Sequence, residues 1–212
     1  RAMVLSRMIG CVCVCVFFFF FFFFFKQKTA YEILSGLVGS VVLMGFATNW
    51  AAAGLLALAI LFYVFVYTVW LKRRTPHNIV IGGLAGALSP LVGWTAAGGD
   101  PLALLPWGMV AIIFLWTPPH FWALSLLPRG DYARAGIPML PVVRGVPETA
   151  RSIILHSAIL VTVSVLFVTT QAVGLIYLAG ALALGTVQLL LAGRLLRSGG
   201  TRHARQLYLF SL

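Results

Sequence analysis

The sequence predicts an all-α polytopic membrane protein, and three observations lead to this fold class. The 212 residues are 61% hydrophobic and only 9% charged, which is far more apolar than a soluble domain. The apolar residues fall in long runs, and about 20 such residues cross a bilayer as one helix. The formal net charge is +11, but the cations lie in short connections between the runs, where Lys and Arg orient membrane proteins. The composition therefore excludes a soluble globular protein. We expect the protein to lie in a lipid bilayer and to have no nucleic-acid partner.

Residues 1–33 form a segment that we interpret as a non-native leader. It holds all three Cys, and one unbroken run, 17–25, holds nine of the sixteen Phe. Alternating Val and Cys is what a GTGTGT repeat encodes, and poly-Phe is what poly-T encodes. The residues from Phe25 to Ile33 resemble the translation of a sequencing adapter, so we exclude the segment from the fold prediction.

Two biological alternatives to this interpretation remain open. A signal anchor would place Arg1 and Arg7 before the apolar stretch from Met8 to Phe25. A metal site or disulfide set would use Cys11, Cys13 and Cys15, although the sequence has no second Cys cluster to complete it.

From Ser35 onward the apolar runs have the length of membrane helices. We expect one partial span, 35–48, and five full spans. The full spans are 50–71, 79–96, 102–126, 153–170 and 173–192. A polar loop is expected at 127–150 and a basic tail at 194–205, and residues 206–212 resemble the opening of another helix. Gly82, Gly83 and Gly86 are expected to let neighbouring helices pack closely.

The cations predict how these spans are oriented. All Lys and Arg after the leader fall in alternate connections, and the other connections contain none. Because cytoplasmic connections carry the excess of Lys and Arg, we expect the cation-bearing connections to be cytoplasmic. The spans contain no Asp, Glu, Lys or Arg between their ends, which disfavours an ion-coupled pump. The chemistry is therefore expected at the inner face.

The connection after the first full span combines charge with hydrogen-bond donors. Lys72, Arg73 and Arg74 lie at the end of a helix, followed by the polar residues Thr75, His77 and Asn78. Such a set suits a polyanion such as a diphosphate. A cluster that only orients the protein would have the same composition.

The second notable segment lies at the end of the span 102–126. Pro118 and Pro119 are expected to break this helix, and such a break is tolerated where the backbone lines a cavity or is buried in protein. The neighbouring side chains would then face a cavity or pack between helices; they are Trp116, His120, Phe121 and Trp122. An aromatic band at the membrane interface is the competing interpretation of the tryptophans. Asp131 further on is either a loop residue in an ion pair or a metal ligand.

Three strings in this order carry a resemblance: YTVWLKRRTPHNIVIGG, WTPPHFWAL and DYARAGIPMLPVV. They resemble the protohaem IX farnesyltransferases (haem O synthases), which belong to the UbiA-type intramembrane prenyltransferases. The resemblance runs from about Ser35 to Leu212 and includes the final ARQLYLFSL. Residues 35–212 are therefore interpreted as a partial UbiA-type domain that lacks the first helices and the C-terminal end of the family, and the leader has no place in it.

The resemblance implies a Mg²⁺-dependent transfer of a farnesyl group from farnesyl diphosphate to a vinyl group of haem b, giving haem O. Breaking the allylic C–O bond requires that metal and fixed cations neutralise the departing diphosphate. The prenyl cation must be kept from water and can be stabilised by aromatic faces. The resemblance further implies a multi-pass protein of the bacterial inner membrane, with haem A synthase or the terminal oxidase assembly as candidate contacts.

The same resemblance implies roles for individual residues. Diphosphate binding is expected from Lys72, Arg73, Arg74, Asn78 and Arg134, and Arg134 could instead pair with a haem propionate. Asp131 is expected to coordinate Mg²⁺ directly or through water, and Asp131 and His120 are the catalytic candidates. Haem contacts are expected from His77, His120, Trp116 and Trp122. Either histidine could ligate the iron, move a proton or serve only as an uncharged hydrogen-bonding group.

The sequence departs from the family pattern in one respect that matters. The first acidic motif of the family, an Asn/Asp-rich loop, is absent, and the leader stands in its place. Ser89 precedes Pro90 where the family usually has a second proline, a change of little expected effect. Because one aspartate cannot build the usual metal cluster, we expect the polypeptide as written to be inactive.

Two rival functions remain. A UbiA-type prenyltransferase acting on a quinone or another aromatic acceptor shares the fold and the metal logic, although the second and third strings favour haem. A transporter or a structural membrane subunit is the rival of another class, and the charge-free spans argue against ion coupling.

Overall fold

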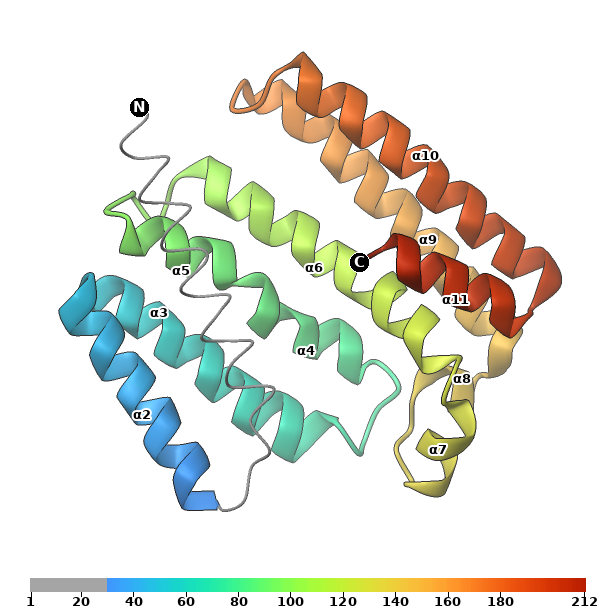
Figure 1. Ribbon diagram of the computed structural model, residues 1–212, viewed down its shortest axis with the longest axis horizontal. Helices are drawn as coiled ribbons and strands as arrows, with labels where there is room; N and C mark the ends of the chain where they lie inside the picture. Colours follow the sequence, from blue (N-terminus) through green and yellow to red (C-terminus); the bar gives the residue numbers. More distant parts are fainter. Residues whose placement is uncertain (1–29) are drawn as a thin grey trace. The chain divides into compact units, whose positions relative to one another are not determined.

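The computed structural model describes residues 30–212, with side chains from residue 36 onward, and the secondary structure of this part is helical throughout (Figure 1). The interpretation of the leader falls almost entirely outside the described residues. The chain divides into two compact units, and each is described by itself. Of the described residues, unit 1 comprises 30–64 and Ala85–Val110, and unit 2 comprises Phe65–Leu84 and Ala111–Leu212.

The elements follow one another without strands in the described part of the chain. In order they are α2 (Ala30–Ala47), α3 (Trp50–Leu61), the π-helix η1 (Phe62–Leu71), α4 (Asn78–Ala87), α5 (Ser89–Ala96), α6 (Leu104–Ser125), α7 (Arg129–Arg134), α8 (Leu140–Val143), α9 (Gly145–Leu166), the 3-10 helix η2 (Phe167–Thr170), α10 (Leu175–Ser198) and α11 (Thr201–Phe210).

Five helical stretches are long and apolar enough to cross a membrane, which confirms the expected full spans. Their bounds are Trp50–Leu71, Asn78–Ala96, Leu104–Ser125, Gly145–Thr170 and Leu175–Ser198. A shorter apolar helix, Gly36–Ala47, corresponds to the expected partial span. The protein is an integral membrane protein.

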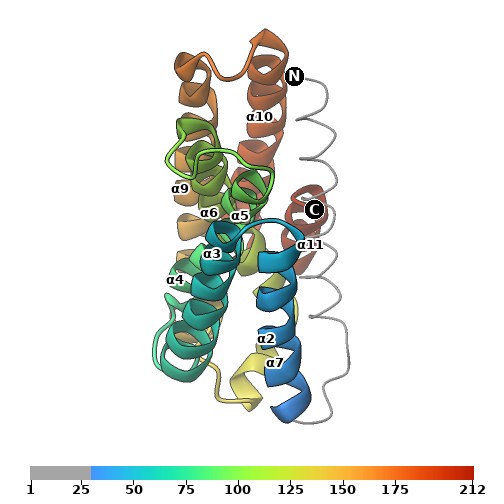
Figure 2. The same cartoon turned by 90° about the vertical axis from the view of Figure 1, so that its left-hand side faces the viewer.

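Unit 1 begins with two neighbouring antiparallel helices, α2 and α3, joined by a short turn (Figure 2). Asn49 lies in this turn, and its side chain forms hydrogen bonds with both α3 and α5. Its Oδ1 accepts from the Ala52 amide at 2.9 Å, which caps α3. Its Nδ2 donates to the Thr95 carbonyl of α5 at 2.8 Å. One polar residue therefore fixes the start of α3 and its packing on α5.

Unit 2 has its core where α6, α8, α9, α10 and α11 meet. The buried side chains include Trp122, Leu140, Ile153, Leu195 and Leu207. Close helix packing comes from small residues: a Cβ at Gly185 of α10 would lie 2.8 Å from the Val161 side chain of α9.

The glycines of the predicted span 79–96 confirm close packing at two of three positions. A Cβ at Gly82 would collide with the Tyr67 ring of η1, and one at Gly83 would lie 2.9 Å from Thr117 Cγ2 of α6. Gly86 has nothing within 4 Å of that position, so its assignment to a packing surface was wrong. A small-residue pattern does not by itself tell which positions face a neighbour.

The paired prolines do not break their helix, contrary to the prediction. α6 continues through Pro118 and Pro119, and both prolines are fully buried. Carbonyls that lose their amide partner to proline are tolerated in a membrane helix that neighbours cover. Burial on the α6 surface therefore outweighs the local preference for a break.

The segment between the third and fourth full spans, predicted as a polar loop, contains α7, α8 and the start of α9. Pro147 and Glu148 lie in the first turn of α9, where proline and an acidic side chain favour helix initiation. The basic tail is also helical: α10 extends to Ser198 and ends at Gly199 in a left-handed conformation. α11 begins at Thr201 and buries Ala204 and Leu207, so its cations lie on the polar face of an amphipathic helix.

Candidate functional site

The basic loop, which we define as Lys72–Asn78, joins η1 to α4 within unit 2. The wide turns of η1 end where the Lys72 amide donates to the Tyr67 carbonyl at 2.8 Å, and π-type turns are frequent at functional sites. The side chains of Arg73, Arg74 and His77 are exposed, whereas Lys72 is half-buried. The loop therefore presents two guanidinium groups and one imidazole to an incoming ligand.

Asn78 connects the two ends of the basic loop. It is fully buried, and its Nδ2 donates to the Lys72 carbonyl at 3.1 Å. Its Oδ1 is buried without a hydrogen-bond partner among the described residues, which is a costly condition for a polar atom. Because this free atom is an acceptor, it suits a water molecule, a hydroxyl or a cation rather than a diphosphate oxygen.

The second part of the site is a cluster of rings at the C-terminal half of α6. Trp116 and His120 stack with their centroids 4.4 Å apart and 21° between the ring planes. Phe121 meets His120 edge-on at 5.3 Å, and Tyr208 of α11 lies 5.0 Å from it. His120 is buried and Trp116 half-buried. Trp116 and His120 pack against α11, which was one of the two arrangements predicted for them, whereas Phe121 is exposed.

Ser211 joins this cluster and was not identified from the sequence. Its hydroxyl lies 2.7 Å from His120 Nδ1, and its carbonyl accepts from Trp116 Nε1 at 3.0 Å. The residue lies in the string ARQLYLFSL, which carried resemblance but no assigned role. Contacts across more than 90 residues of sequence leave no local signal, so composition and spacing could not reveal them.

Trp122 points into the core of unit 2. It is 2% exposed, and its Nε1 is the second buried side-chain atom without a partner in the described part of the chain. The ring meets the imidazole of His156 edge-on at 4.9 Å, and His156 Nδ1 lies 2.9 Å from the Ser152 carbonyl. A buried indole donor without an acceptor can serve a polar ligand or a water molecule.

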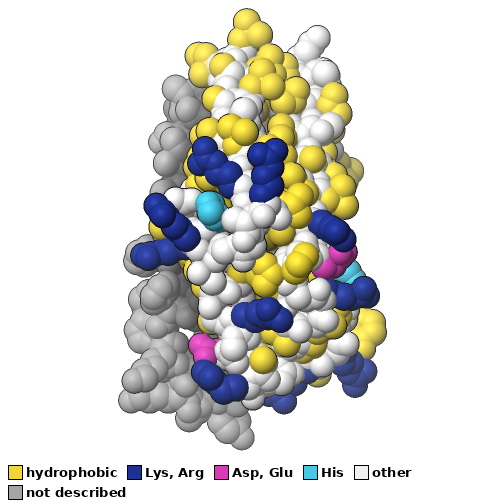
Figure 3. Space-filling model, turned by 90° about the vertical axis from the view of Figure 1, so that its right-hand side faces the viewer, with side chains coloured by type: hydrophobic (Ala, Val, Ile, Leu, Met, Phe, Trp, Pro, Cys, Tyr) yellow, Lys and Arg dark blue, Asp and Glu magenta, His cyan; other side chains and the backbone are white. Residues whose placement is uncertain are grey.

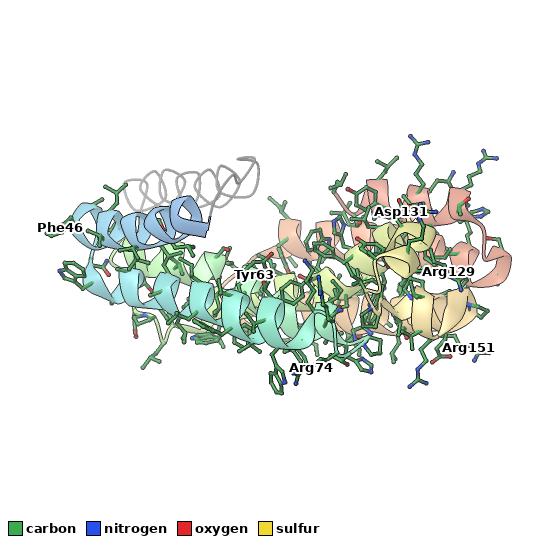
Figure 4. All side chains as sticks on the ribbon, turned by 90° about the horizontal axis from the view of Figure 1, so that it is seen from below. Phe46, Tyr63, Arg74, Arg129, Asp131 and Arg151 are labelled. Atoms are coloured by element: carbon green, nitrogen blue, oxygen red, sulfur yellow. The ribbon has the colours of Figure 1, made fainter. Side chains whose placement is uncertain are left out.

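Asp131 and Arg134 form an ion pair on the surface of α7. The side chains are 68% and 80% exposed, respectively, so the pair is solvated and weak. The pair matches the ion-paired alternative that the sequence left open for Asp131, and Figure 4 labels Asp131 and Arg129 at α7. Among the described residues, no group of three or more His, Cys, Asp or Glu could hold a metal ion.

The structure does not bring all predicted site residues together. No ion pair in residues 36–212 joins Lys72, Arg73 or Arg74 to Asp131, and Figure 4 shows Arg74 apart from Asp131. The predicted site residues therefore fall in four groups within unit 2: the basic loop, the ring cluster of α6 and α11, Trp122 in the core, and the α7 ion pair.

All eleven Lys and Arg of the described chain belong to unit 2. They lie at corresponding helix ends: after η1, after α6, at the start of α9, and at the end of α10 with α11. Figure 3 shows basic side chains spread over one face of the molecule with few acidic ones between them. Only Arg134 and Arg151 form ion pairs in this part of the chain.

Comparisons with known proteins place the chain in a family. The model of the UbiA prenyltransferase family matches residues 25–212. The protoheme IX farnesyltransferase of Caulobacter vibrioides is 59% identical over 159 residues, which are 75% of this chain and 47% of that protein. That of Acidiphilium cryptum is 54% identical over 74% of this chain and 50% of its own length. That of Rhodopseudomonas palustris (strain BisB18) is 51% identical over 82% and 56%.

The chain spans about half the length of the curated relatives that it matches. No solved structure matches the chain. The family model covers all five membrane-spanning helices and the three strings that carried the resemblance.

Proposed function

Because the chain belongs to the UbiA prenyltransferase family, we propose that the whole protein transfers a farnesyl group from farnesyl diphosphate to a vinyl group of haem b, giving haem O. The observation that carries this proposal is the 51–59% identity to proteins named protoheme IX farnesyltransferase. Unit 2 supports it with an exposed basic loop and a cluster of aromatic rings around the buried His120.

The basic loop is the proposed diphosphate site. Arg73 and Arg74 can each present a forked set of donors to phosphate oxygens, and both side chains are exposed. Lys72 adds a point charge at the end of η1. Asn78 contributes by closing the loop through its bond to the Lys72 carbonyl. When the allylic C–O bond breaks, the electron pair stays on the diphosphate, and these fixed cations stabilise the developing negative charge.

The described residues do not by themselves make a magnesium site. Asp131 is proposed as one ligand, direct or through water, and Arg134 as a partner for a phosphate or a haem propionate. Asp131 and Arg134 form an ion pair with each other. A metal ion or phosphate that binds at α7 must therefore replace this ion pair. Because Mg²⁺ prefers octahedral oxygen ligands, a metal at Asp131 needs further oxygens from substrate, water or other parts of the protein.

The ring cluster is the proposed haem side of the site. His120 is proposed to ligate the iron or to move a proton, with Trp116 and Trp122 contacting the macrocycle or the farnesyl chain. Aromatic faces stabilise a carbocation while excluding water. His77 in the basic loop is exposed and is the second candidate for haem contact.

We place the protein in the bacterial inner membrane with the basic loop, α7 and α11 on the cytoplasmic side. The positions of all eleven described cations at corresponding helix ends support this orientation. Haem A synthase or the terminal oxidase assembly is proposed as a contact, because haem O must pass to the enzymes that use it.

The rival acceptor is a quinone precursor, and one assay separates the two. The whole protein in bilayers receives farnesyl diphosphate and Mg²⁺ with either haem b or 4-hydroxybenzoate, and products are identified by mass spectrometry. Farnesylated haem supports the proposal. A prenylated benzoate without farnesylated haem contradicts it, and the absence of both products favours a transporter or structural subunit.

The 212-residue polypeptide by itself is proposed to be inactive. It has four acidic residues in all, and those in the described part form no metal cluster. Haem O formation by the purified 212-residue chain with farnesyl diphosphate and Mg²⁺ would overturn this point while leaving the proposed reaction intact.

A further inference from the structure

We propose that Ser211 is a positioning residue that fixes His120 in the tautomer with the proton on Nδ1, which leaves Nε2 with a free lone pair. The inference extends the proposed function, because it names the reactive nitrogen of a proposed haem residue. It stands on contacts within unit 2 that do not depend on the identity of the substrate.

The proton count at Ser211 decides the tautomer. A serine hydroxyl has one proton to donate and two lone pairs to accept with. The Ser211 hydroxyl donates to the Tyr208 carbonyl at 2.8 Å, and a carbonyl is an acceptor only. With its proton directed to that carbonyl, the hydroxyl offers a lone pair to His120 Nδ1, 2.7 Å away, and we infer that Nδ1 carries the proton. In the neutral imidazole, Nε2 is then unprotonated.

The ring is held in this orientation from several sides. Trp116 stacks on one side of His120, and the Trp116 indole is itself bonded to the Ser211 carbonyl at 3.0 Å. Ser211 thus contacts two residues one turn apart on α6, one through its hydroxyl and one through its backbone. Tyr208 lies near the same imidazole. The arrangement fixes both rotation and tautomer of the ring.

The other nitrogen of His120 has no hydrogen-bond partner in residues 36–212. An unprotonated imidazole nitrogen is what both iron ligation and proton acceptance require. A second group bonded to the opposite nitrogen is the common device for holding a ligating histidine in place. Here a serine hydroxyl supplies that bond, relayed to a backbone carbonyl of α11.

The chain contains a matched pair that serves as a control. Ser198 Oγ lies 2.8 Å from His203 Nδ1, but this pair is exposed and outside the ring cluster. Ser198→Ala removes a serine from a histidine at nearly the same distance without touching His120.

The test is nitrogen NMR of the 212-residue chain in lipid bilayers, with ¹⁵N in its four histidines. His120 is assigned through His120→Gln. The wild-type chain is expected to show His120 protonated on Nδ1. Ser211→Ala is expected to convert a major fraction to the Nε2-protonated form, Ser211→Thr to restore the wild-type form, and Ser198→Ala to alter His203 alone.

Two results would overturn the proposal: His120 protonated on Nε2 in the wild-type chain, or a tautomer that Ser211→Ala leaves unchanged. Unaltered signals of His77, His156 and His203 report that Ser211→Ala has not unfolded the chain. If it does unfold, the wild-type tautomer and the Ser211→Thr variant still decide.

A second measurement uses the whole protein and haem b. Removing a group that orients a ligating residue typically costs about 10- to 100-fold in metal affinity or activity, and this loss is expected in kcat for Ser211→Ala with recovery in Ser211→Thr. The tautomer is measured without haem b or farnesyl diphosphate. A failed turnover assay would therefore count against the proposed function, and a wrong tautomer against the positioning role of Ser211.

Discussion

Unit 1 and unit 2 are made of the same kind of apolar helix, yet they treat polar groups differently. The described part of unit 1 contains no Lys or Arg. Three side-chain amide and indole donors described there go to backbone carbonyls: Asn49 to Thr95, Trp94 to Asp100 and Trp107 to Pro101. Unit 2 holds all eleven described cations, all four histidines and both buried polar atoms that lack a partner.

This difference suggests that unit 1 serves as a scaffold and that unit 2 carries the polar groups available for chemistry. In a bilayer, polar groups must be satisfied internally because lipid offers no hydrogen bonds, and Asn49, Trp94 and Trp107 of unit 1 meet this requirement with backbone carbonyls of the same unit. Among the described residues, Asn78 Oδ1 and Trp122 Nε1 of unit 2 have no hydrogen-bond partner, and only two of its cations form ion pairs. Such groups are retained where a ligand or water completes them.

The largest expected effect contrasts buried and lipid-facing leucines. Leu195→Ala in unit 2 removes a fully buried side chain from the core and is expected to cost about 2–5 kcal/mol of unfolding free energy. Leu58→Ala in unit 1 truncates a side chain that is 56% exposed and is expected to cost below about 1 kcal/mol. Unfolding in mixed micelles measures both, and equal losses would contradict the assignment of the core.

The second effect concerns the basic loop. Arg73→Ala or Arg74→Ala in the whole protein is expected to lower kcat/KM for farnesyl diphosphate by about 10- to 100-fold, since a charged hydrogen bond contributes about 1.5–3 kcal/mol. Arg197→Ala is the matched control: its side chain is exposed at the end of α10, and the rate should stay within about twofold. A similar loss in all three variants would show that general positive charge, rather than this loop, acts on the substrate.

The third effect tests helix packing along α4, which has residues in both units. Gly83→Ala forces a Cβ against Thr117 and is expected to destabilise the protein by about 1–3 kcal/mol. Gly86→Ala has open space and should be neutral or stabilising by about 0.5–1 kcal/mol. Thermal unfolding in detergent distinguishes the two, and a stabilising Gly83→Ala would contradict the packing described for unit 2.

The smallest expected effect lies at the α7 ion pair. Asp131→Asn breaks the exposed pair with Arg134, and the unfolding free energy should change by about 0–1 kcal/mol. Activity of the whole protein should nevertheless fall if Asp131 contributes to metal binding. Glu148→Gln, which breaks the other exposed pair, provides the control, and activity losses of the same size in both variants would argue against a special role for Asp131.

The sequence was sufficient for the spans and for most of the positions of charge. Run length encodes a membrane helix directly, so Trp50–Leu71 agreed with its expected bounds and Asn78–Ala96 differed by one residue. The cytoplasmic orientation stays a prediction, which rests on the cations falling in alternate connections.

Features that depend on tertiary contact could not be read in this way. Pro118 and Pro119 carry a strong local signal for a break, but burial keeps α6 continuous. The sequence predicted a helix only from residue 206, whereas α11 begins at Thr201. Its first residues are polar, and the packing of Ala204 and Leu207 in the core accounts for the helix there. The contact of Ser211 with His120 joins α6 to the end of α11, a pairing that no spacing rule encodes.

The basic loop of unit 2 is proposed to bind the diphosphate. Its most direct test is the rate at which phenylglyoxal modifies each arginine of the whole protein, measured by mass spectrometry with and without farnesyl diphosphate. We expect farnesyl diphosphate to slow modification of Arg73 and Arg74 and to leave Arg194 and Arg197 unchanged. Equal rates at Arg73 and Arg74 with and without the substrate would contradict the claim.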